Sequence, residues 1–109
     1  MELQFSIIIP VYNRPQEIEE LLQSLTTQTY ANQFEVIVVE DGSTLKATDI
    51  VAKYSNELTV KYFYKENSGA GESRNFGMQQ ATGNYFIIFD SDCVIPSHYL
   101  EEVDQSLKQ

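Results

Sequence analysis

Two aspartates, Asp90 and Asp92, stand one residue apart directly after the apolar run from Tyr85 to Phe89. Carboxylates held this close repel each other, and a hard divalent cation bound between them by oxygen ligands relieves that repulsion most simply. Such a cation could bridge the phosphate oxygens of a nucleotide and stabilise a departing diphosphate. The alternative is an Asx turn or a helix cap, which an isolated Asp-x-Asp motif favours equally well.

The apolar run that precedes the two aspartates predicts a strand buried on both faces, because neither side of it carries polar residues. In an open α/β sheet, ligands bind just beyond the C-terminal ends of the strands. Both carboxylates would then lie at that edge. This position favours the binding role of the pair over the turn.

Three further segments also predict strands, and each predicted strand is followed by a polar loop and a helical pattern. The four predicted strands cover residues 5–10, 34–39, 58–64 and 85–89. Alternation of strand and helix predicts parallel strands joined by right-handed crossovers. The expected fold class is α/β, an open and mainly parallel sheet with helices on both faces, in a single domain over residues 1–109.

Polar residues and glycines predict where the helices begin and end. Asn13 is expected to cap the helix after the first strand, and Thr44 the helix after the second. A weaker helix is expected over residues 68–81, ended by Gly83. The last helix is expected to pack through an apolar stripe made of Tyr99, Leu100, Val103 and Leu107.

Four polar loops should meet at the C-terminal edge of such a sheet, because parallel strands end at the same edge. These loops are residues 11–14, 40–43, 65–69 and 90–92. In the second loop, Asp41 is favoured over Glu40 as an acceptor for a ligand N–H or hydroxyl, since Glu40 should point to the opposite side of the strand. In the first loop, Tyr12 could stack on a planar base.

Residues 68–77 combine glycines with Arg74 at the start of a helix. They do not match the dinucleotide-binding fingerprint, which needs a glycine where Arg74 stands. Two interpretations remain: a helix N-terminus whose free N–H groups face an anion together with Arg74, and a flexible loop with a surface arginine. His98 and Cys93 are interpreted as structural, since the sequence shows neither a catalytic pair nor zinc-ligand spacing around them.

Composition narrows the range of partners and locations. Among 109 residues, 7 Lys and Arg against 16 Asp and Glu give a net charge of −9. This charge argues against a nucleic acid partner and against an anionic membrane surface. No apolar run approaches the roughly 20 residues of a membrane span, and the first residues lack the positive region of a secretion signal. The single cysteine, Cys93, indicates a reducing compartment, so a cytoplasmic location is expected.

Four blocks of the sequence together resemble family 2 glycosyltransferases. They are SIIIPVYNR at 6–14, VVEDGST at 38–44, ENSG at 66–69 with SRNFG at 73–77, and FDSD at 89–92. Each block is short, but they occur in the family's order and spacing and span nearly the whole chain. The resemblance implies the GT-A variant of the nucleotide-binding α/β sheet. It also implies transfer of a sugar from a nucleotide diphosphate donor, usually with inversion.

The resemblance implies roles for individual residues as well. The implied nucleotide-binding residues are Pro10, Val11, Tyr12, Asn13, Asp41, Arg74, Asp90 and Ser91. Among them, Asp41 would accept a hydrogen bond from the base, and Arg74 would approach the base or the diphosphate. Asp92, helped by Asp90, would hold Mn²⁺ or Mg²⁺ against the diphosphate. A UDP-sugar is the expected donor, and a saccharide or a lipid-linked molecule the expected acceptor.

The sequence departs from the family's pattern in two respects. Glu40 stands where the family more often has aspartate, which should matter little if this side chain points away from the ligand. The family's catalytic domain is about twice as long as this chain, and its acidic catalytic base lies well downstream of the metal motif. Glu101 and Asp104 are expected on a solvated helix face rather than in that role, so the catalytic residue is unassigned.

The chain is therefore expected to be the donor-binding half of a glycosyltransferase. It should bind a nucleotide diphosphate weakly and with metal dependence, and should show negligible transfer by itself. Its apolar run from Tyr85 to Phe89 is expected to form an uncovered edge through which the chain self-associates.

Two other functional classes remain as alternatives. A phosphatase of the haloacid dehalogenase type also places Asp-x-Asp after an apolar strand, but normally at the start of its domain. A receiver-like signalling domain or a nucleotide sensor also gathers carboxylates at strand ends. A receiver, however, would need a lysine after a later strand, which this sequence lacks.

Overall fold

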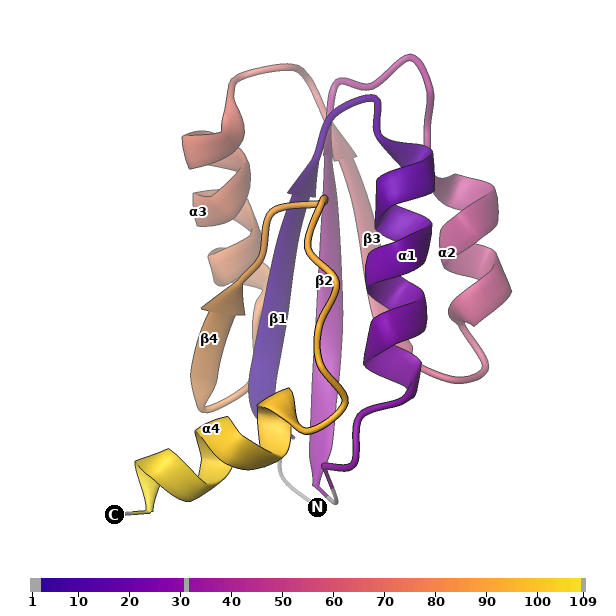
Figure 1. Cartoon of the computed structure of the whole chain (residues 1–109). Helices are drawn as coiled ribbons and strands as arrows, with labels where there is room; N and C mark the ends of the chain where they lie inside the picture. The colour runs from indigo at the N-terminus through magenta and orange to yellow at the C-terminus, as the bar shows by residue number, and fades with distance from the viewer. Residues whose placement is uncertain (1–2, 31, 109) are drawn as a thin grey trace.

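The computed structural model describes residues 3–30 and 32–108 and contains a four-stranded sheet in which neighbouring strands are parallel (Figure 1). The strands lie in the order β3-β2-β1-β4. In chain order the elements are β1 Leu3–Val11, α1 Pro15–Thr26, β2 Gln33–Asp41, α2 Thr48–Tyr54, β3 Thr59–Lys65, α3 Ala70–Gln80, β4 Tyr85–Ile88 and α4 Tyr99–Leu107. The predicted α/β fold class is confirmed.

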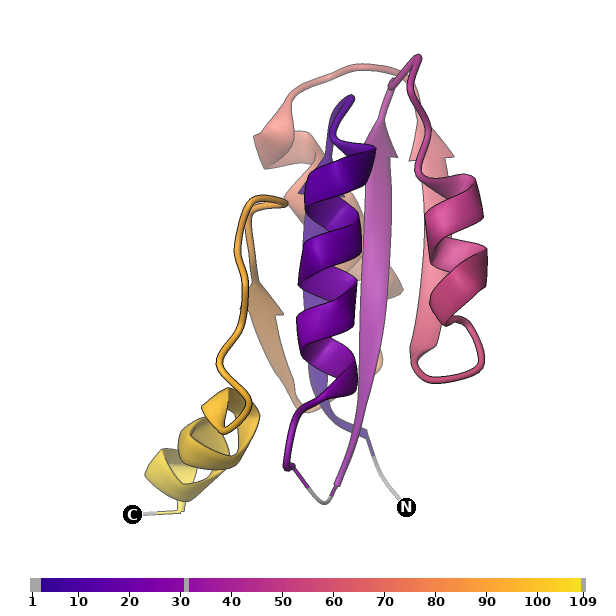
Figure 2. The ribbon, with the colours of Figure 1, turned by 45° about the vertical axis from the view of Figure 1, so that its right-hand side comes forward.

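Helices cover both faces of the sheet. Helices α1 and α2 lie on one face and α3 on the other (Figure 2). The chain steps from β1 to β2 to β3 in one direction, and α3 then carries it back across the sheet to β4 on the far side of β1. Strand order therefore reverses between β1 and β4, which makes that position the topological switch point of the sheet.

The two central strands supply most of the core because both of their faces are covered. Alternate side chains point to opposite faces, so Ile7 and Ile9 pack with α1 while Ile8 packs beneath α3. On the α3 side, Gly77 permits a close approach between helix and sheet. A Cβ there would lie 2.6 Å from Ile8 Cγ2, so a larger residue would force the helix away from the sheet.

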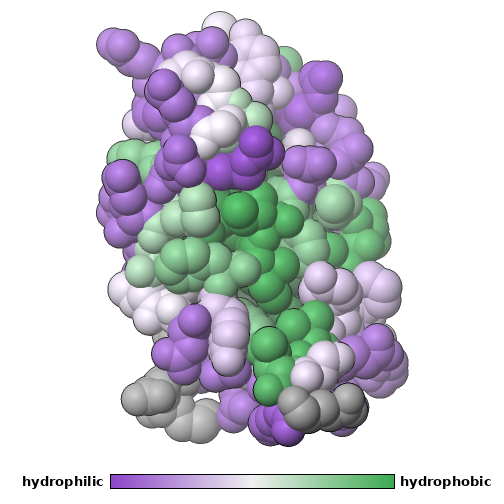
Figure 3. All heavy atoms as spheres, turned by 90° about the vertical axis from the view of Figure 1, so that its left-hand side faces the viewer, coloured by the Kyte–Doolittle hydropathy of each residue, from purple (hydrophilic) through white to green (hydrophobic). Residues whose placement is uncertain are grey.

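Strand β4 differs from the prediction that residues 85–89 are buried on both faces. It is an edge strand that pairs only with β1. Three of its side chains are exposed, Tyr85 by 45%, Phe86 by 47% and Ile88 by 40%. Helix α3 crosses over β1 and β2 and leaves this strand uncovered. Figure 3, which faces that side of the molecule, shows apolar residues gathered across its centre.

The helix ends also differ from the predicted caps. Helix α1 starts after Arg14, so Asn13 lies one residue before the cap position. Helix α2 starts after Ala47, and Thr44 belongs to the preceding loop. Helix α3 ends before Ala81, ahead of the predicted stop at Gly83. The side chains of Asn13 and Thr44 make their contacts elsewhere, and the chain leaves α3 before it reaches Gly83.

Helix α4 packs on the same face as α1, at the end of the sheet opposite to the C-terminal strand ends (Figure 1). Its Leu100 is fully buried. Asp104 is buried as well and pairs with Lys108 at 3.0 Å, which corrects the expectation that it lies on a solvated face. His98 is not isolated, because its Nδ1 lies 3.0 Å from Thr29 Oγ1.

Within the part of the chain that the structure describes, no helix combines the length and the apolar character needed to cross a membrane.

A buried glutamate joins the C-terminal end of α3 to the sheet. Glu35 of β2 is fully buried, and its Oε2 accepts from Ser6 Oγ at 2.6 Å and from Thr82 N at 2.7 Å. Its Oε1 pairs with Lys61 Nζ at 2.8 Å. Burial alone would raise the pKa of Glu35, but the bonds from Lys61, Ser6 and Thr82 outweigh it and lower the pKa to about 2.

We expect Glu35→Gln to lower the free energy of unfolding by about 1–3 kcal/mol at neutral pH, because a buried charged acceptor with several donors is lost. The wild-type advantage should be full above 4.5, the ordinary pKa of the carboxyl, and should shrink as the pH falls towards about 2. The reason is that the unfolded chain takes up the proton before the folded chain does. Urea unfolding followed by circular dichroism, at about pH 7 and about pH 3, measures both effects.

Glu57→Gln is the matched control, since Glu57 is an exposed glutamate outside this network. It should stay within about 0.5 kcal/mol of wild type. A Glu35→Gln chain with wild-type stability at both pH values would contradict the stabilising role given to the ionised Glu35 carboxylate.

Candidate functional site

A pocket of about 330 Å³ opens at the C-terminal ends of the strands, at the switch point between β1 and β4. Strand ends at a switch point are where open α/β sheets bind ligands. The pocket is lined by Pro10, Val11, Tyr12, Arg14, Asp41, Asn67, Ala70, Asp90 and Ser91. Segments far apart in the sequence therefore form one hollow.

Most of the residues named from the sequence line this pocket. Those that do are Pro10, Val11, Tyr12, Asp41, Asp90 and Ser91, whereas Asn13, Arg74 and Asp92 do not. Arg74 lies half-buried on α3, and Asp92 is an exposed residue in the loop after β4. The pocket also includes Arg14, Asn67 and Ala70, which were not predicted. Of these, Arg14 and Asn67 belong to the loops 11–14 and 65–69, which were predicted to meet at this edge although neither residue was named as a site residue.

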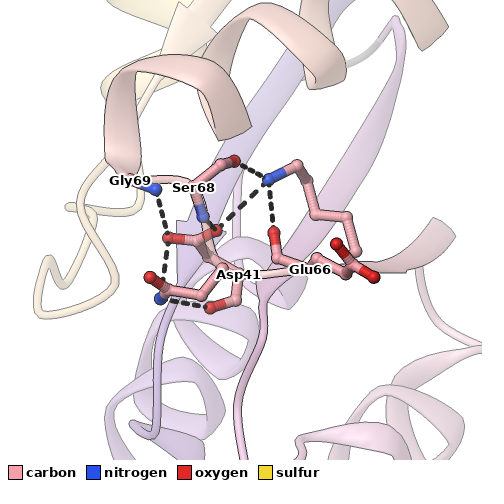
Figure 4. A network of polar contacts seen from close by, with 6 residues as sticks. Asp41, Glu66, Ser68 and Gly69 are labelled. Carbon is pink, nitrogen blue, oxygen red and sulfur yellow. Dashed lines mark hydrogen bonds and ion pairs between the residues drawn. The ribbon is translucent and has the colours of Figure 1, made fainter.

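Asp41 is the most extensively bonded side chain of the pocket (Figure 4). It is the last residue of β2 and faces α3. Its Oδ1 accepts from Ser68 N at 2.8 Å and from Lys65 Nζ at 3.2 Å, and its Oδ2 accepts from Gly69 N at 3.0 Å. The pKa of Asp41 is lowered, because these donors outweigh the raising effect of burial.

This arrangement changes the interpretation of the glycine-rich segment before α3. One of the two interpretations of the sequence was that free N–H groups there face an anion together with Arg74, and the other was a flexible loop with a surface arginine. In the structure, Ser68 N and Gly69 N at the start of α3 bind the Asp41 carboxylate of the same chain. A carboxylate at a helix N-terminus is favourably placed in the helix dipole. Asp41 is therefore bound by the two N–H groups that precede Ala70, the first residue of α3.

The loops after β2 and β3 are held against each other beside Asp41. Asn67 Nδ2 donates to the Asp41 backbone oxygen at 3.0 Å and approaches Oδ2 at 3.5 Å. Gly42 turns with φ 73°, and a Cβ on it would lie 2.7 Å from Asn67 N. Such close contact requires glycine at this position. Lys65 completes the network through Ser68 Oγ and the Glu66 backbone oxygen (Figure 4).

Glu40 lies on the opposite side of β2 from Asp41, as alternation along a strand requires. It is fully buried, and its Oε1 accepts from Ala47 N at 2.5 Å at the start of α2. Burial and the neighbouring Glu40 carboxylate raise the pKa of the Tyr62 hydroxyl. Glu40 thus fixes the loop that leads to α2 and does not face the pocket.

The loop after β4 presents the two paired aspartates to solvent. Phe89 N donates to Ile8 O at 3.1 Å, which ties the strand end to β1, and Cys93 N donates to Asp90 O at 3.1 Å, which closes a turn. Asp90 is exposed and lines the pocket, and Asp92 is exposed beside it. Among the described residues, no three His, Cys, Asp or Glu side chains gather as a metal centre. The two carboxylates do offer the hard oxygen atoms that Mg²⁺ and Mn²⁺ prefer.

Comparison with known proteins shows the same fold and sequence pattern. The family model described as glycosyl transferase family 2 matches residues 6–109. An uncharacterized glycosyltransferase of Rickettsia conorii is 36% identical over 107 residues, which is 98% of this chain and 17% of the relative. The chain thus spans about a sixth of that relative's length.

Two solved structures show the likeness in three dimensions. The first 349 residues of Staphylococcus aureus TarS, in complex with UDP-GlcNAc, match with a TM-score of 0.91 at 38% identity, over 97% of this chain and 31% of that one. The mannosyltransferase PcManGT of Pyrobaculum calidifontis, in complex with GDP-Man and Mn²⁺, matches with a TM-score of 0.78 at 27% identity, over 88% and 29% of the two chains.

The order of the sequence blocks, the sheet topology and these matches agree, and the chain belongs to glycosyltransferase family 2.

Proposed function

We propose that this chain binds the nucleotide diphosphate sugar of an inverting, metal-dependent glycosyl transfer and forms the donor-binding half of that enzyme, a domain over residues 1–109. The observation that carries the proposal is the meeting of Tyr12, Asp41 and Asp90 in one pocket at the switch point of the sheet. These residues come from three different strand ends. They offer an aromatic face, an acceptor and a carboxylate, which are the groups that a base, a ribose and a metal-bound diphosphate require.

Within this proposal, Pro10 and Val11 form the apolar wall of the pocket, and Tyr12 stacks on the base. Tyr12 is 51% exposed, so its ring is available to a ligand. Asp41 Oδ2, which Asn67 Nδ2 approaches only to 3.5 Å, accepts a hydrogen bond from an N–H of the base. Asp90 and Ser91 bind the ribose from the opposite side of the pocket.

Asp92, with Asp90, would hold Mn²⁺ or Mg²⁺ against the diphosphate, with phosphate oxygens completing the coordination. A divalent cation there supplies charge neutralisation for the leaving nucleoside diphosphate. Support for this assignment comes from the exposed oxygen donors of the loop after β4 and from the Mn²⁺ and GDP-Man present in the PcManGT structure. Arg74, half-buried on α3, would approach the base or the diphosphate.

UDP is the nucleotide we propose, because two TarS structures that match this chain with a TM-score of 0.91 contain UDP and UDP-GlcNAc. The acceptor would be a hydroxyl of a saccharide or a lipid-linked molecule, and its attack on the anomeric carbon from the face opposite the nucleotide would invert the configuration. The chain's own residues in this step bind and orient the donor.

We expect UDP to bind the chain at least about tenfold more tightly with Mn²⁺ than with EDTA, because a cation screens the diphosphate from Asp90 and Asp92. Uridine, which has no diphosphate, should bind independently of Mn²⁺. Asp92→Asn should abolish most of the Mn²⁺ effect on UDP. Isothermal titration calorimetry of UDP and of uridine, each with Mn²⁺ and with EDTA, on the wild-type and Asp92→Asn chains measures each difference.

Glu102→Gln is the control, since it removes an exposed carboxylate on α4. Its UDP affinity should be unchanged. Acetyl phosphate with Mg²⁺, titrated in the same way, tests the receiver-like alternative. Failure of UDP to bind under any condition would refute the proposal.

We expect no measurable sugar transfer by the 109-residue chain alone. Glu101 and Asp104, the acidic residues considered for the role of base, lie on α4 at the end of the sheet away from the pocket (Figure 1). Without a positioned base, the acceptor hydroxyl loses about 10²–10⁴-fold in rate. Release of UDP from UDP-GlcNAc, assayed with hexose and lipid-linked acceptors, measures this, and robust turnover would contradict it.

We also propose that the chain self-associates through the free edge of β4. An unpaired strand edge with exposed Tyr85, Phe86 and Ile88 offers both main-chain hydrogen bonds and apolar contact to a second copy. Phe86→Lys should shift the sedimentation profile towards monomer, because a charge on this edge opposes pairing. Asn56→Lys adds the same charge at an exposed loop and should leave the profile unchanged. A monomeric wild-type chain at high concentration would contradict the proposal.

A further inference from the structure

Asn13 separates two pocket-lining residues, Tyr12 and Arg14, but does not line the pocket itself. It adopts a left-handed backbone conformation with φ 53°, the only residue other than glycine with positive φ among the described residues. Asparagine tolerates this conformation better than most residues do. The chain between β1 and α1 thus turns at Asn13, and the residues on either side of the turn face the pocket.

Both the backbone and the side chain of Asn13 are fastened to the loop after β2. Asn13 Oδ1 accepts from Thr44 N at 2.8 Å, from Leu45 N at 2.9 Å and from Thr44 Oγ1 at 3.2 Å. Asn13 N donates to Ser43 Oγ at 2.9 Å. Ser43 is buried, so the loop offers Asn13 a fixed partner.

These bonds use the oxygen that Asn13 would otherwise offer to a ligand. An amide oxygen has two lone pairs, and three donors already share this one. This oxygen therefore acts inside the protein, between two of the loops that form the pocket. This differs from the nucleotide-binding role that the sequence resemblance implied for Asn13.

The position of Tyr12 depends on such a constraint. Its side chain is 51% exposed, so packing does little to fix the ring. The residue before it, Val11, is the last residue of β1 and is buried, and the next fixed point along the chain is the bond network of Asn13. A ring on an unfastened turn would have to be ordered when the base binds, and that ordering weakens affinity.

We propose that Asn13 is a positioning residue of the nucleotide pocket, which holds Tyr12 in place for the base through its bonds to residues 43–45. The inference rests on the proposed nucleotide binding. Asn13 touches no ligand in this scheme and acts through Tyr12.

A double-mutant cycle measured with UDP and Mn²⁺ on the full chain tests the proposal. Asn13→Ala and Tyr12→Ala should each weaken UDP binding about fivefold, in the range expected for one aromatic contact. The double variant should lose about fivefold as well, because removing Tyr12 removes what Asn13 acts on. Independent roles would instead multiply to a loss of about 25-fold, which would overturn the inference.

Two further variants separate positioning from general stability. Asn13→Asp keeps an acceptor oxygen and tolerates the left-handed conformation, so it should bind uridine, which has no diphosphate for the added charge to repel, within about twofold of wild type. Asn13→Gly keeps the backbone conformation but loses the side-chain bonds, so it should bind as weakly as Asn13→Ala. The glycine variant also serves if the alanine variant does not fold.

The outcomes distinguish this inference from the function on which it rests. A wild-type chain that does not bind UDP would overturn both. A wild-type chain that binds UDP, together with an Asn13→Gly variant of equal affinity, would overturn the inference alone.

Discussion

The position of α3 depends on two carboxylates that project from the same face of β2. Asp41 binds the backbone N–H groups at the start of the helix, and Glu35 binds Thr82 just after its end. The strand from Glu35 to Asp41 spans roughly 20 Å, and α3, from Ala70 to Gln80, spans roughly 15 Å, with Gly69 and Thr82 just outside its two ends. One strand thus holds a whole helix at both ends. The pKa of Asp41 is lowered mainly by the N–H of Ser68, with Lys65 and Gly69, whereas the pKa of Glu35 is lowered mainly by Lys61 and Ser6, with Thr82 adding to them.

The contacts that hold α3 also determine the shape of the pocket. Because Asp41 occupies the N-terminus of α3, the loop after β3 closes over the end of β2 and brings Asn67 and Ala70 to the pocket wall. Asn13 makes a second connection, from the loop after β1 to the loop after β2. Three strand-end loops are therefore joined by side-chain oxygens that accept hydrogen bonds from backbone N–H groups. Hydrogen bonds of this kind hold loop segments in place without requiring a hydrophobic core.

Sequence reasoning predicted the fold and the edge of the sheet that carries the pocket, because strand–helix alternation and apolar runs are local properties. The apolar pattern could not predict which strand becomes the edge, and the expectation of an uncovered edge at residues 85–89 came from the family resemblance. Residues 85–88 are as apolar as a central strand, and their exposure follows from strand order, which periodicity does not encode. Asn13 and Thr44 looked like helix caps for a related reason. The Asn13 side chain accepts from backbone N–H groups of a neighbouring loop, and the Thr44 side chain donates to Asn13, and such partners are invisible in a single local window.

The charges of the pocket support the proposal that a diphosphate binds there together with a cation. The chain carries a net charge of −9, and the pocket brings Asp41 and Asp90 together with Asp92 nearby. Lys65 is committed to Asp41, and Arg14 is shared with Glu17 at 3.2 Å. Two of the nearby basic side chains are therefore already neutralised within the protein. A diphosphate next to Asp90 and Asp92 would be repelled by their negative charge, and a divalent cation held by these carboxylates would offset that repulsion.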